Sequence, residues 1–137
     1  MNSLADVKLI DLPKIADDRG NLSIIENLKH VPFTMKRVHW IYDVPGGIVR
    51  GGHAFKKNEE FIVALSGSFD VLLDDGKGQK VISLKRSYYG LYIPNGIWRV
   101  MNDFSTNALA LVLSSNDYSD DDYILDYEDF KTWRAAK

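Results

Sequence analysis

The side chains best suited to chemistry lie in one stretch, GGIVRGGHAFKKNEE, which spans residues 46–60. It places His53, one of only three histidines in the chain, among basic residues and a pair of glutamates. An imidazole titrates near neutral pH, so histidine is the usual side chain for moving a proton in an enzyme. The neighbouring Arg50 and Lys57 would attract an anion such as a phosphate or a carboxylate. The stretch therefore predicts a site for proton transfer on a negatively charged ligand.

The elements that must position His53 are predicted to be β-strands. Between residues 22 and 115 the apolar side chains recur mostly with period two, and turns rich in Gly, Pro and Asp separate the runs. This pattern is typical of half-buried strands. Because no helical pattern intervenes, a sandwich or barrel is favoured over a parallel α/β sheet. We therefore expect an all-β barrel over about residues 20–115.

The C-terminal residues have a different pattern. In SDDDYILDYEDFKTWRAA the aromatic side chains recur at helix-like intervals. Ser119, followed three residues later by Asp122, resembles a capping box at a helix start. We expect a short α-helix over about residues 119–135, packed on the barrel by its aromatic side chains. Barrel and helix together would make a single domain over residues 1–137, which is a common domain size.

The composition limits the partners of this domain. A net charge of −2 and a pI near 5.9 argue against a surface built for nucleic acid. No segment approaches the run of about 18 apolar residues that spans a membrane. The chain has no cysteine, which excludes disulfides and thiolate metal sites and fits a reducing compartment. We expect no nucleic-acid partner, no membrane segment and a cytoplasmic location.

Two ordered sets of residues have the layout of the two cupin motifs. The first set is Gly47, His53, Phe55, Glu59 and Gly67, and the second lies within PNGIWRVMN, residues 94–102. In cupins these motifs form neighbouring strands of a jelly roll, where many members bind a metal with three histidines and a glutamate. Here Phe55 and Arg99 stand at two of the histidine positions, and a guanidinium repels a metal cation. The resemblance implies a cupin jelly roll, and the residues predict that it holds no metal and no other cofactor.

A longer resemblance covers residues 17–133. It is carried by DDRGNLSIIENLKHVPFTMKRVHWIYDVPGGIVRGGHAFKKNEEFIVALSGSFDVLLDDG, by GLYIPNGIWRVMNDFS and by DYILDYEDF, which closely resemble the dTDP-sugar 3,4-ketoisomerase family of cupins. The resemblance implies a homodimer in which N-terminal strands cross to the partner subunit. It also implies that dTDP-4-keto-6-deoxyglucose is converted to a dTDP-3-keto-6-deoxyhexose, for the synthesis of deoxyamino sugars and surface polysaccharides.

The expected reaction determines which side chains are catalytic. Moving the carbonyl from C4 to C3 of the sugar removes the proton on C3, forms an enediol and protonates C4, which calls for an acid/base group. Members of the family typically have two active-site histidines in the segment that reads RGGHAFK here. His53 matches the first, whereas Phe55 replaces the second and cannot transfer a proton.

Three interpretations follow from that replacement. In the first, His53 performs both transfers with help from Tyr42, His39 or a water. In the second, the chain acts on a related keto sugar with a different proton donor. In the third, it binds a dTDP-sugar without catalysis. A 3,5-epimerase-like enzyme on the same substrate is a further alternative, and such enzymes usually rely on a histidine–aspartate dyad.

The residues expected to contact the substrate surround His53 in the sequence or match positions of the family. They are Arg19, Arg50, Gly52, Phe55, Lys57, Glu59 and Arg99. Arg50 is expected to contact the diphosphate. The competing interpretations are an ordinary turn ion pair for Arg19 and a solvated charge for Lys57, as for many lysines on strand edges.

Within this set, spacing predicts which side chains face the ligand. The positions of His53 and Glu59 differ by six, an even number. Glu59 rather than Glu60 is therefore expected to face inward, to orient His53 or to pair with Arg99. Gly51 and Gly52 are expected to admit close approach of the ligand to the backbone. Phe55 is expected to form an apolar wall of the pocket.

Overall fold

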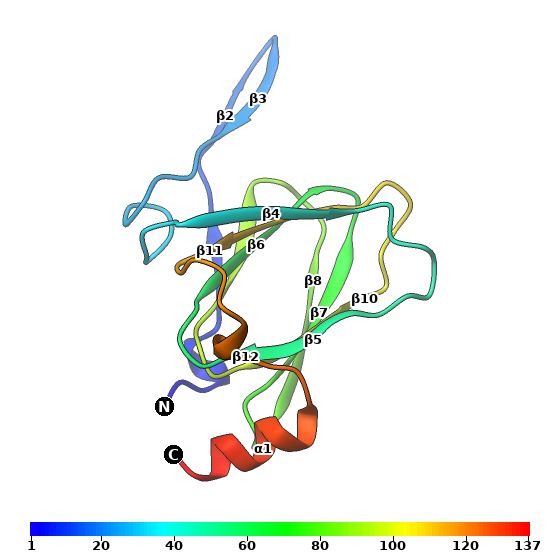
Figure 1. Cartoon of the computed structure of the whole chain (residues 1–137). Coiled ribbons are helices and arrows are strands. Elements are labelled where there is room, and N and C mark those ends of the chain that lie inside the picture. Colours follow the sequence, from blue (N-terminus) through cyan, green and yellow to red (C-terminus); the bar gives the residue numbers. More distant parts are fainter.

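Two five-stranded sheets pack face to face and form a jelly roll (Figure 1). This computed structural model describes all of residues 1–137. One sheet has the strand order β1-β9-β6-β11-β4, and the other has the order β12-β5-β10-β7-β8. Every pairing within the two sheets is antiparallel. The all-β jelly roll predicted from the sequence is confirmed.

The elements follow one another along the chain, and the long connection between β3 and β4 spans residues 24–36. They are η1 (Leu4–Asp6), β1 (Lys8–Asp11), β2 (Lys14–Asp17), β3 (Gly20–Ser23), β4 (Arg37–Tyr42), β5 (Arg50–Phe55), β6 (Glu60–Ser66), β7 (Phe69–Asp74), β8 (Gln79–Leu84), β9 (Tyr89–Ile93), β10 (Trp98–Asn102), β11 (Leu109–Ser114), η2 (Asp120–Asp122), β12 (Tyr123–Ile124) and α1 (Tyr127–Ala135). β1 lies before the expected start of the barrel and still belongs to the first sheet, because it pairs with β9.

The main core lies between the two sheets. Phe69, Val71 and Leu73 alternate along β7 and are all buried, as the period-two pattern of the sequence predicts. They pack with inward residues of the opposite sheet, including Ile62 of β6 and Val112 of β11. Burial of each such side chain stabilises the fold by about 1.5–3 kcal/mol. This core fixes the separation of the sheets and so the space available for a site between them.

The C-terminal helix begins later than the sequence pattern indicated. Residues 120–124 form a 3₁₀ turn and the strand β12, and α1 begins only at Tyr127. The Asp126 side chain accepts a hydrogen bond from the Asp129 N–H at 3.0 Å and so caps the helix, whereas Ser119 makes no side-chain cap. Phe130 is buried against Trp98 on the outer face of the second sheet, as the aromatic spacing predicts. No helix of the protein is long and apolar enough to cross a membrane.

The hairpin formed by β2 and β3 projects from the body of the molecule (Figure 1). Its two strands pair only with each other, with Ile15 opposite Leu22. Both side chains are about half exposed, at 52% and 54%. A two-stranded hairpin of this kind is at best marginally stable in water by itself.

Candidate active site

His53 lies on β5, directly opposite Arg99 on the neighbouring strand β10. The register shifts beside this pair, because the next paired residues are Arg50 and Met101. From one pair to the next the chain moves three positions along β5 but only two along β10, so β5 contains a β-bulge. Gly51 in the bulge has a φ of +78°, and a Cβ at this position would collide with Nη1 of Arg99. A glycine at position 51 therefore lets the guanidinium lie against the backbone beside His53.

Arg99 forms a buried ion pair with Glu60, the first residue of β6. Nε and Nη2 of Arg99 each donate a hydrogen bond of 2.8 Å to one carboxylate oxygen of Glu60, and the side chains are 3% and 2% exposed. Burial alone would raise the pKa of Glu60, but the charge and hydrogen bonds of Arg99 outweigh burial and hold that pKa below its usual value. The pair is therefore ionised at neutral pH and places a fixed cation next to His53.

The His53 ring is mostly enclosed, and its Nε2 is buried without a hydrogen-bond partner. Buried polar atoms nearly always have a partner, so this nitrogen is suited to a ligand atom. Burial, and next the charge of Arg99, lower the pKa of His53 to about 3. At neutral pH the ring is therefore uncharged, with one nitrogen able to accept a proton and the other able to donate one.

Phe55 and Tyr123 form an aromatic wall on one side of His53. The ring centroids of His53 and Phe55 are 4.8 Å apart, those of His53 and Tyr123 are 5.2 Å apart, and those of Phe55 and Tyr123 are 4.6 Å apart. Tyr123 reaches this position because β12 pairs with β5, with Tyr123 opposite Phe55. Phe55 is buried and packs against His53, and its contact with a ligand stays a prediction.

Two further side chains, Arg37 and His39, face this interior from β4. Arg37 Nε is buried without a partner, and its other nitrogens donate only long hydrogen bonds of 3.5 Å to Tyr123 Oη and Ser114 Oγ. The charges of His39 and Arg37 both contribute to the lowered pKa of His53, so both lie within electrostatic range of it. The sequence reasoning overlooked Arg37. The alternation in RVHWIY puts Arg37 and His39 on one face, but does not say which face is inward.

The structure does not bring Tyr42 to His53. Tyr42 is 61% exposed, and it lies on the outer face of β4, opposite to the face of His39. The positions of His39 and Tyr42 differ by three, an odd number, so their side chains point to different sides of the sheet. The expectation that Tyr42 assists His53 disagrees with this position.

Glu59 is not the inward-facing acid, so that prediction is wrong. The Glu59 N–H donates to Ser115 Oγ at 2.8 Å, and its carboxylate accepts a hydrogen bond from the Tyr92 hydroxyl. The carboxylate that pairs with Arg99 belongs to Glu60. The even spacing from His53 does not predict the inward side chain because β5 ends at Phe55 and β6 begins at Glu60. Residues 56–59 lie between the strands, where strand alternation does not continue.

Gly52 and Arg50 flank the site in different ways. A Cβ on Gly52 would meet the Trp98 ring at 3.4 Å, so Gly52 faces the outer side of the sheet. At Gly51 the close approach is that of the Arg99 guanidinium rather than of a ligand. Arg50 begins β5 with an exposed side chain, which leaves it free to contact a charged part of a ligand at the edge of the barrel.

Lys57 and Arg19 lie away from His53 within this chain. Lys57 lines a surface hollow together with Asn116 and Asp117. Arg19 lies in the turn of the projecting hairpin, where its side chain is 90% exposed and Nη2 donates to Asp17 Oδ2 at 2.8 Å. The structure thus matches the alternative of a turn ion pair for Arg19 in a single protomer.

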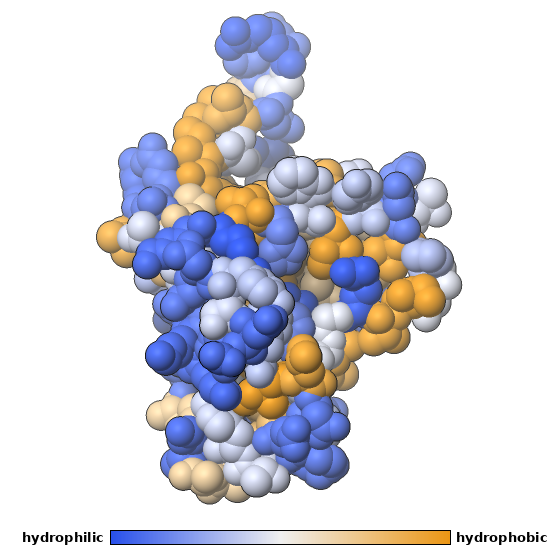
Figure 2. Space-filling model, in the orientation of Figure 1, coloured by the Kyte–Doolittle hydropathy of each residue, from blue (hydrophilic) through white to orange (hydrophobic).

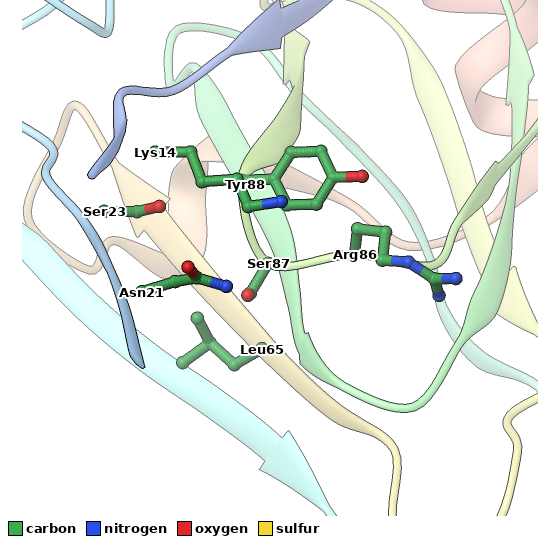
Figure 3. A pocket seen from close by; sticks show the side chains of 7 residues that line it. All are labelled: Lys14, Asn21, Ser23, Leu65, Arg86, Ser87 and Tyr88. Carbon is green, nitrogen blue, oxygen red and sulfur yellow. The ribbon is translucent and has the colours of Figure 1, made fainter. Parts of the chain in front are cut away.

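A separate hollow of about 540 Å³ lies between the hairpin and the turn from β8 to β9 (Figure 3). It is lined by Lys14, Asn21, Ser23, Leu65, Arg86, Ser87 and Tyr88. The Lys14 ammonium lies 4.5 Å from the centre of the Tyr88 ring. One wall is the projecting hairpin, so the size of this hollow depends on where the hairpin packs, and none of its lining residues belongs to the His53 site.

The side chains around His53 do not suit the metal ion that many cupins bind. Both oxygens of Glu60 are occupied by Arg99, and Phe55 offers no donor atom. No group of three or more His, Cys, Asp or Glu side chains is arranged to hold a metal ion. A permanent cation at Arg99 would also repel one. The side chains present therefore do not fit that metal ion.

Comparisons with known proteins agree with this geometry. The model of the FdtA family, described as WxcM-like, C-terminal, matches residues 5–135. The TDP-4-oxo-6-deoxy-alpha-D-glucose-3,4-oxoisomerase of Aneurinibacillus thermoaerophilus is 44% identical over 128 residues, which cover 93% of this chain and 92% of that protein.

Two solved structures are similar over nearly their whole lengths. The WlaRB TDP-quinovose 3,4-ketoisomerase of Campylobacter jejuni is 42% identical with a TM-score of 0.90, covering 94% of this chain and 99% of that one. A mutant of the 3,4-ketoisomerase QdtA of Thermoanaerobacterium thermosaccharolyticum, in complex with TDP-4-keto-6-deoxyglucose, is 36% identical with a TM-score of 0.95, covering 98% of each chain. These similarities confirm the resemblance inferred from the sequence, and the chain belongs to the FdtA family.

Proposed function

We propose that this protein is a sugar-nucleotide 3,4-ketoisomerase that converts dTDP-4-keto-6-deoxyglucose to a dTDP-3-keto-6-deoxyhexose, with His53 as the carbon acid/base. The observation that carries the assignment of His53 is its buried, unpartnered Nε2 beside a fixed cation. The relatives with which the chain aligns over nearly all its length bear names of the same reaction. The products of such an enzyme serve the synthesis of deoxyamino sugars for surface polysaccharides.

The proposed mechanism begins with neutral His53. Its free nitrogen takes the proton from C3 of the sugar, the electrons of the C–H bond form the C3–C4 double bond, and negative charge develops on O4. Burial and Arg99 disfavour the imidazolium in the free protein, but the adjacent enediolate is an anion that stabilises it. The hydroxyl proton of O3 passes to O4, and His53 returns the carbon proton to C4 as the C3 carbonyl forms. The reaction is an isomerisation, so atoms and electrons balance without an oxidant or a reductant.

The positive charges of the site would stabilise the enediolate. Arg99 is fixed by Glu60, and the unpartnered Nε of Arg37 is available to an oxygen. Hydrogen-bond donors that already point to the place where negative charge develops usually contribute much of the rate enhancement of an enzyme. Arg50, exposed at the start of β5, remains the candidate for the diphosphate.

Two alternatives remain as outcomes of the test. A dTDP-sugar-binding protein without activity is favoured by Phe55, which removes a proton carrier of the family. A 3,5-epimerase-like enzyme is favoured only by the expected substrate, because the carboxylate nearest in the site, Glu60, is engaged by Arg99 rather than by His53.

We also propose that the protein is a cytoplasmic homodimer with exchange of the N-terminal hairpin. Val38, Trp40 and Tyr42 alternate along the outer face of β4 and are exposed. Figure 2 shows apolar surface along the hairpin below its charged tip. A hairpin that pairs only with itself would gain support from a partner's sheet. Exchange would also carry Arg19 away from its own barrel and toward that of the other protomer.

The test is to incubate the purified protein with dTDP-4-keto-6-deoxyglucose in deuterated water and to follow the sugar by NMR. A 3-keto product is the expected result, and its C4 carries deuterium to the extent that the proton held by His53 exchanges with the solvent before it is returned. Label at C3 and C5 with inverted centres would identify an epimerase, and tight TDP binding without reaction would identify a binding protein.

The role of His53 is tested by His53→Asn, with His30→Asn as the matched control. His30 Nδ1 accepts a hydrogen bond from the Glu26 N–H, away from the barrel interior. General acid/base catalysis typically contributes about 10²–10⁴-fold to the rate. We expect His53→Asn to lower kcat by at least about 10²-fold while TDP binding is retained. A folded His53→Asn protein with unchanged kcat would refute the assignment.

A further inference from the structure

We propose that His39 moves the proton between the two sugar oxygens, O3 and O4, and so performs the transfer that Phe55 cannot. This inference deepens the isomerase function proposed above and rests on it. Isomerisation needs two proton movements: one from C3 to C4, assigned to His53, and one from O3 to O4. Phe55 has no titratable atom, so the second movement requires another group in the same interior.

His39 lies on the inward face of β4. β4 alternates between half-buried and exposed residues, and His39 is on the half-buried face with Arg37 and Ile41. Through the register of the sheet, His39 is level with Val112 of β11, whose side chain lies in the main core between the sheets. His39 therefore faces the opposite sheet, which carries His53.

The charged groups around His39 place it in the same cluster. Glu60 of β6, Arg99 of β10, Arg50 of β5 and Arg37 of β4 all act on its titration, and His39 in turn acts on that of His53. Arg99 and Glu60 are the pair fixed beside His53. Because the half-buried face of β4 also carries His39 toward the opposite sheet, these charges and His39 share one interior.

The protonation state of His39 suits the transfer. Burial lowers its pKa, the Glu60 carboxylate opposes this, and Arg37, Arg99 and Arg50 lower the pKa further. His39 is therefore neutral at rest, with one nitrogen able to accept a proton. The nearby carboxylate of Glu60 keeps the imidazolium accessible as a transient state.

The proton balance follows from this state. After His53 has taken the C3 proton, O4 carries the negative charge of the enediolate. Neutral His39 accepts the proton of the O3 hydroxyl and becomes an imidazolium, which gives the proton to O4 and is neutral again. The negative charge is then on O3, C4 takes the proton from His53, and the C3 carbonyl forms. No other reactant is needed.

The inference is tested with His39→Gln, which retains polarity but cannot carry a proton, and with His30→Gln as the matched control. We expect kcat to fall by about 10²-fold in His39→Gln, while KM and the Kd for TDP change by less than about threefold. His30→Gln should match the wild type. A second variant, His39→Ala, should regain activity on addition of imidazole, which a purely structural role would not explain.

The outcomes separate the two proposals. If the wild-type protein isomerises the sugar and His39→Gln retains kcat within threefold, the role of His39 is refuted and the isomerase function stands. A His39→Gln protein that loses TDP binding, together with an Ala variant that imidazole does not rescue, also refutes it, because His39 would then be only structural. If the wild-type protein produces no 3-keto sugar, the proposed function itself has failed.

Discussion

Replacement of Arg99 by methionine is the strongest single test of the site's electrostatics. Methionine fills a similar volume but leaves Glu60, which is 2% exposed, without the partner that binds both of its oxygens. Removal of one partner of a buried ion pair typically costs about 3–5 kcal/mol. We therefore expect Arg99→Met to lower the free energy of unfolding by about 3–5 kcal/mol at pH 7.

The sign of the pH dependence follows from the pKa of Glu60. In the wild type Arg99 holds this pKa below its unfolded value. Ionised Glu60 therefore stabilises the folded protein above the unfolded pKa, and this stabilisation is lost as the pH falls through the pKa of the folded state. In Arg99→Met burial raises the pKa instead, so the variant is destabilised as pH rises. The difference between the two proteins should be largest near neutral pH and smaller near pH 4.

The measurement is urea unfolding at a fixed protein concentration, at pH 7 and at pH 4.5. The matched control is the double variant Arg99→Met/Glu60→Leu, which removes both charges and should regain most of the lost stability. A loss below about 1 kcal/mol in the single variant, or an equal loss at both pH values, would show that the pair does not hold Glu60 ionised. NMR should also show a higher His53 pKa in the double variant, since Arg99 is its second largest cause of lowering after burial.

Two further perturbations test the bulge and the proposed dimer. Gly51→Ala should destabilise the protein by about 1–3 kcal/mol, because Gly51 has a φ of +78° and a Cβ there would collide with Arg99. The control is Gly46→Ala, since Gly46 has open space around it. Equal melting temperatures for the two variants would contradict the role of Gly51. Trp40→Asp, at a side chain that is 59% exposed on the outer face of β4, should halve the mass measured by light scattering. Leu125→Asp, also exposed, should leave it unchanged, and an unaltered dimer in the Trp40 variant would exclude this face as the interface.

Local sequence patterns predicted the strands well but not the boundaries of every element. The alternation of Phe69, Val71 and Leu73 identified β7, because the face to which each side chain points depends only on its position within that strand. The helix start was misplaced because Ser119 and Asp122 form a 3₁₀ turn before β12 pairs with β5. The partner of β12 is β5, which is distant in the sequence, and the spacing of neighbouring residues cannot reveal such a pairing.

The sequence by itself determined that this chain is a jelly roll with His53 in the first motif, Phe55 at the second histidine position and Arg99 in the second motif. These are residue identities in ordered motifs, so they can be read without coordinates. Only the tertiary structure decided that Glu60 rather than Glu59 pairs with Arg99, that Arg37 and His39 face inward, and that Tyr42 faces outward. The physical reason is that alternation defines two faces within one strand, whereas the face that becomes interior is set by the packing of the two sheets.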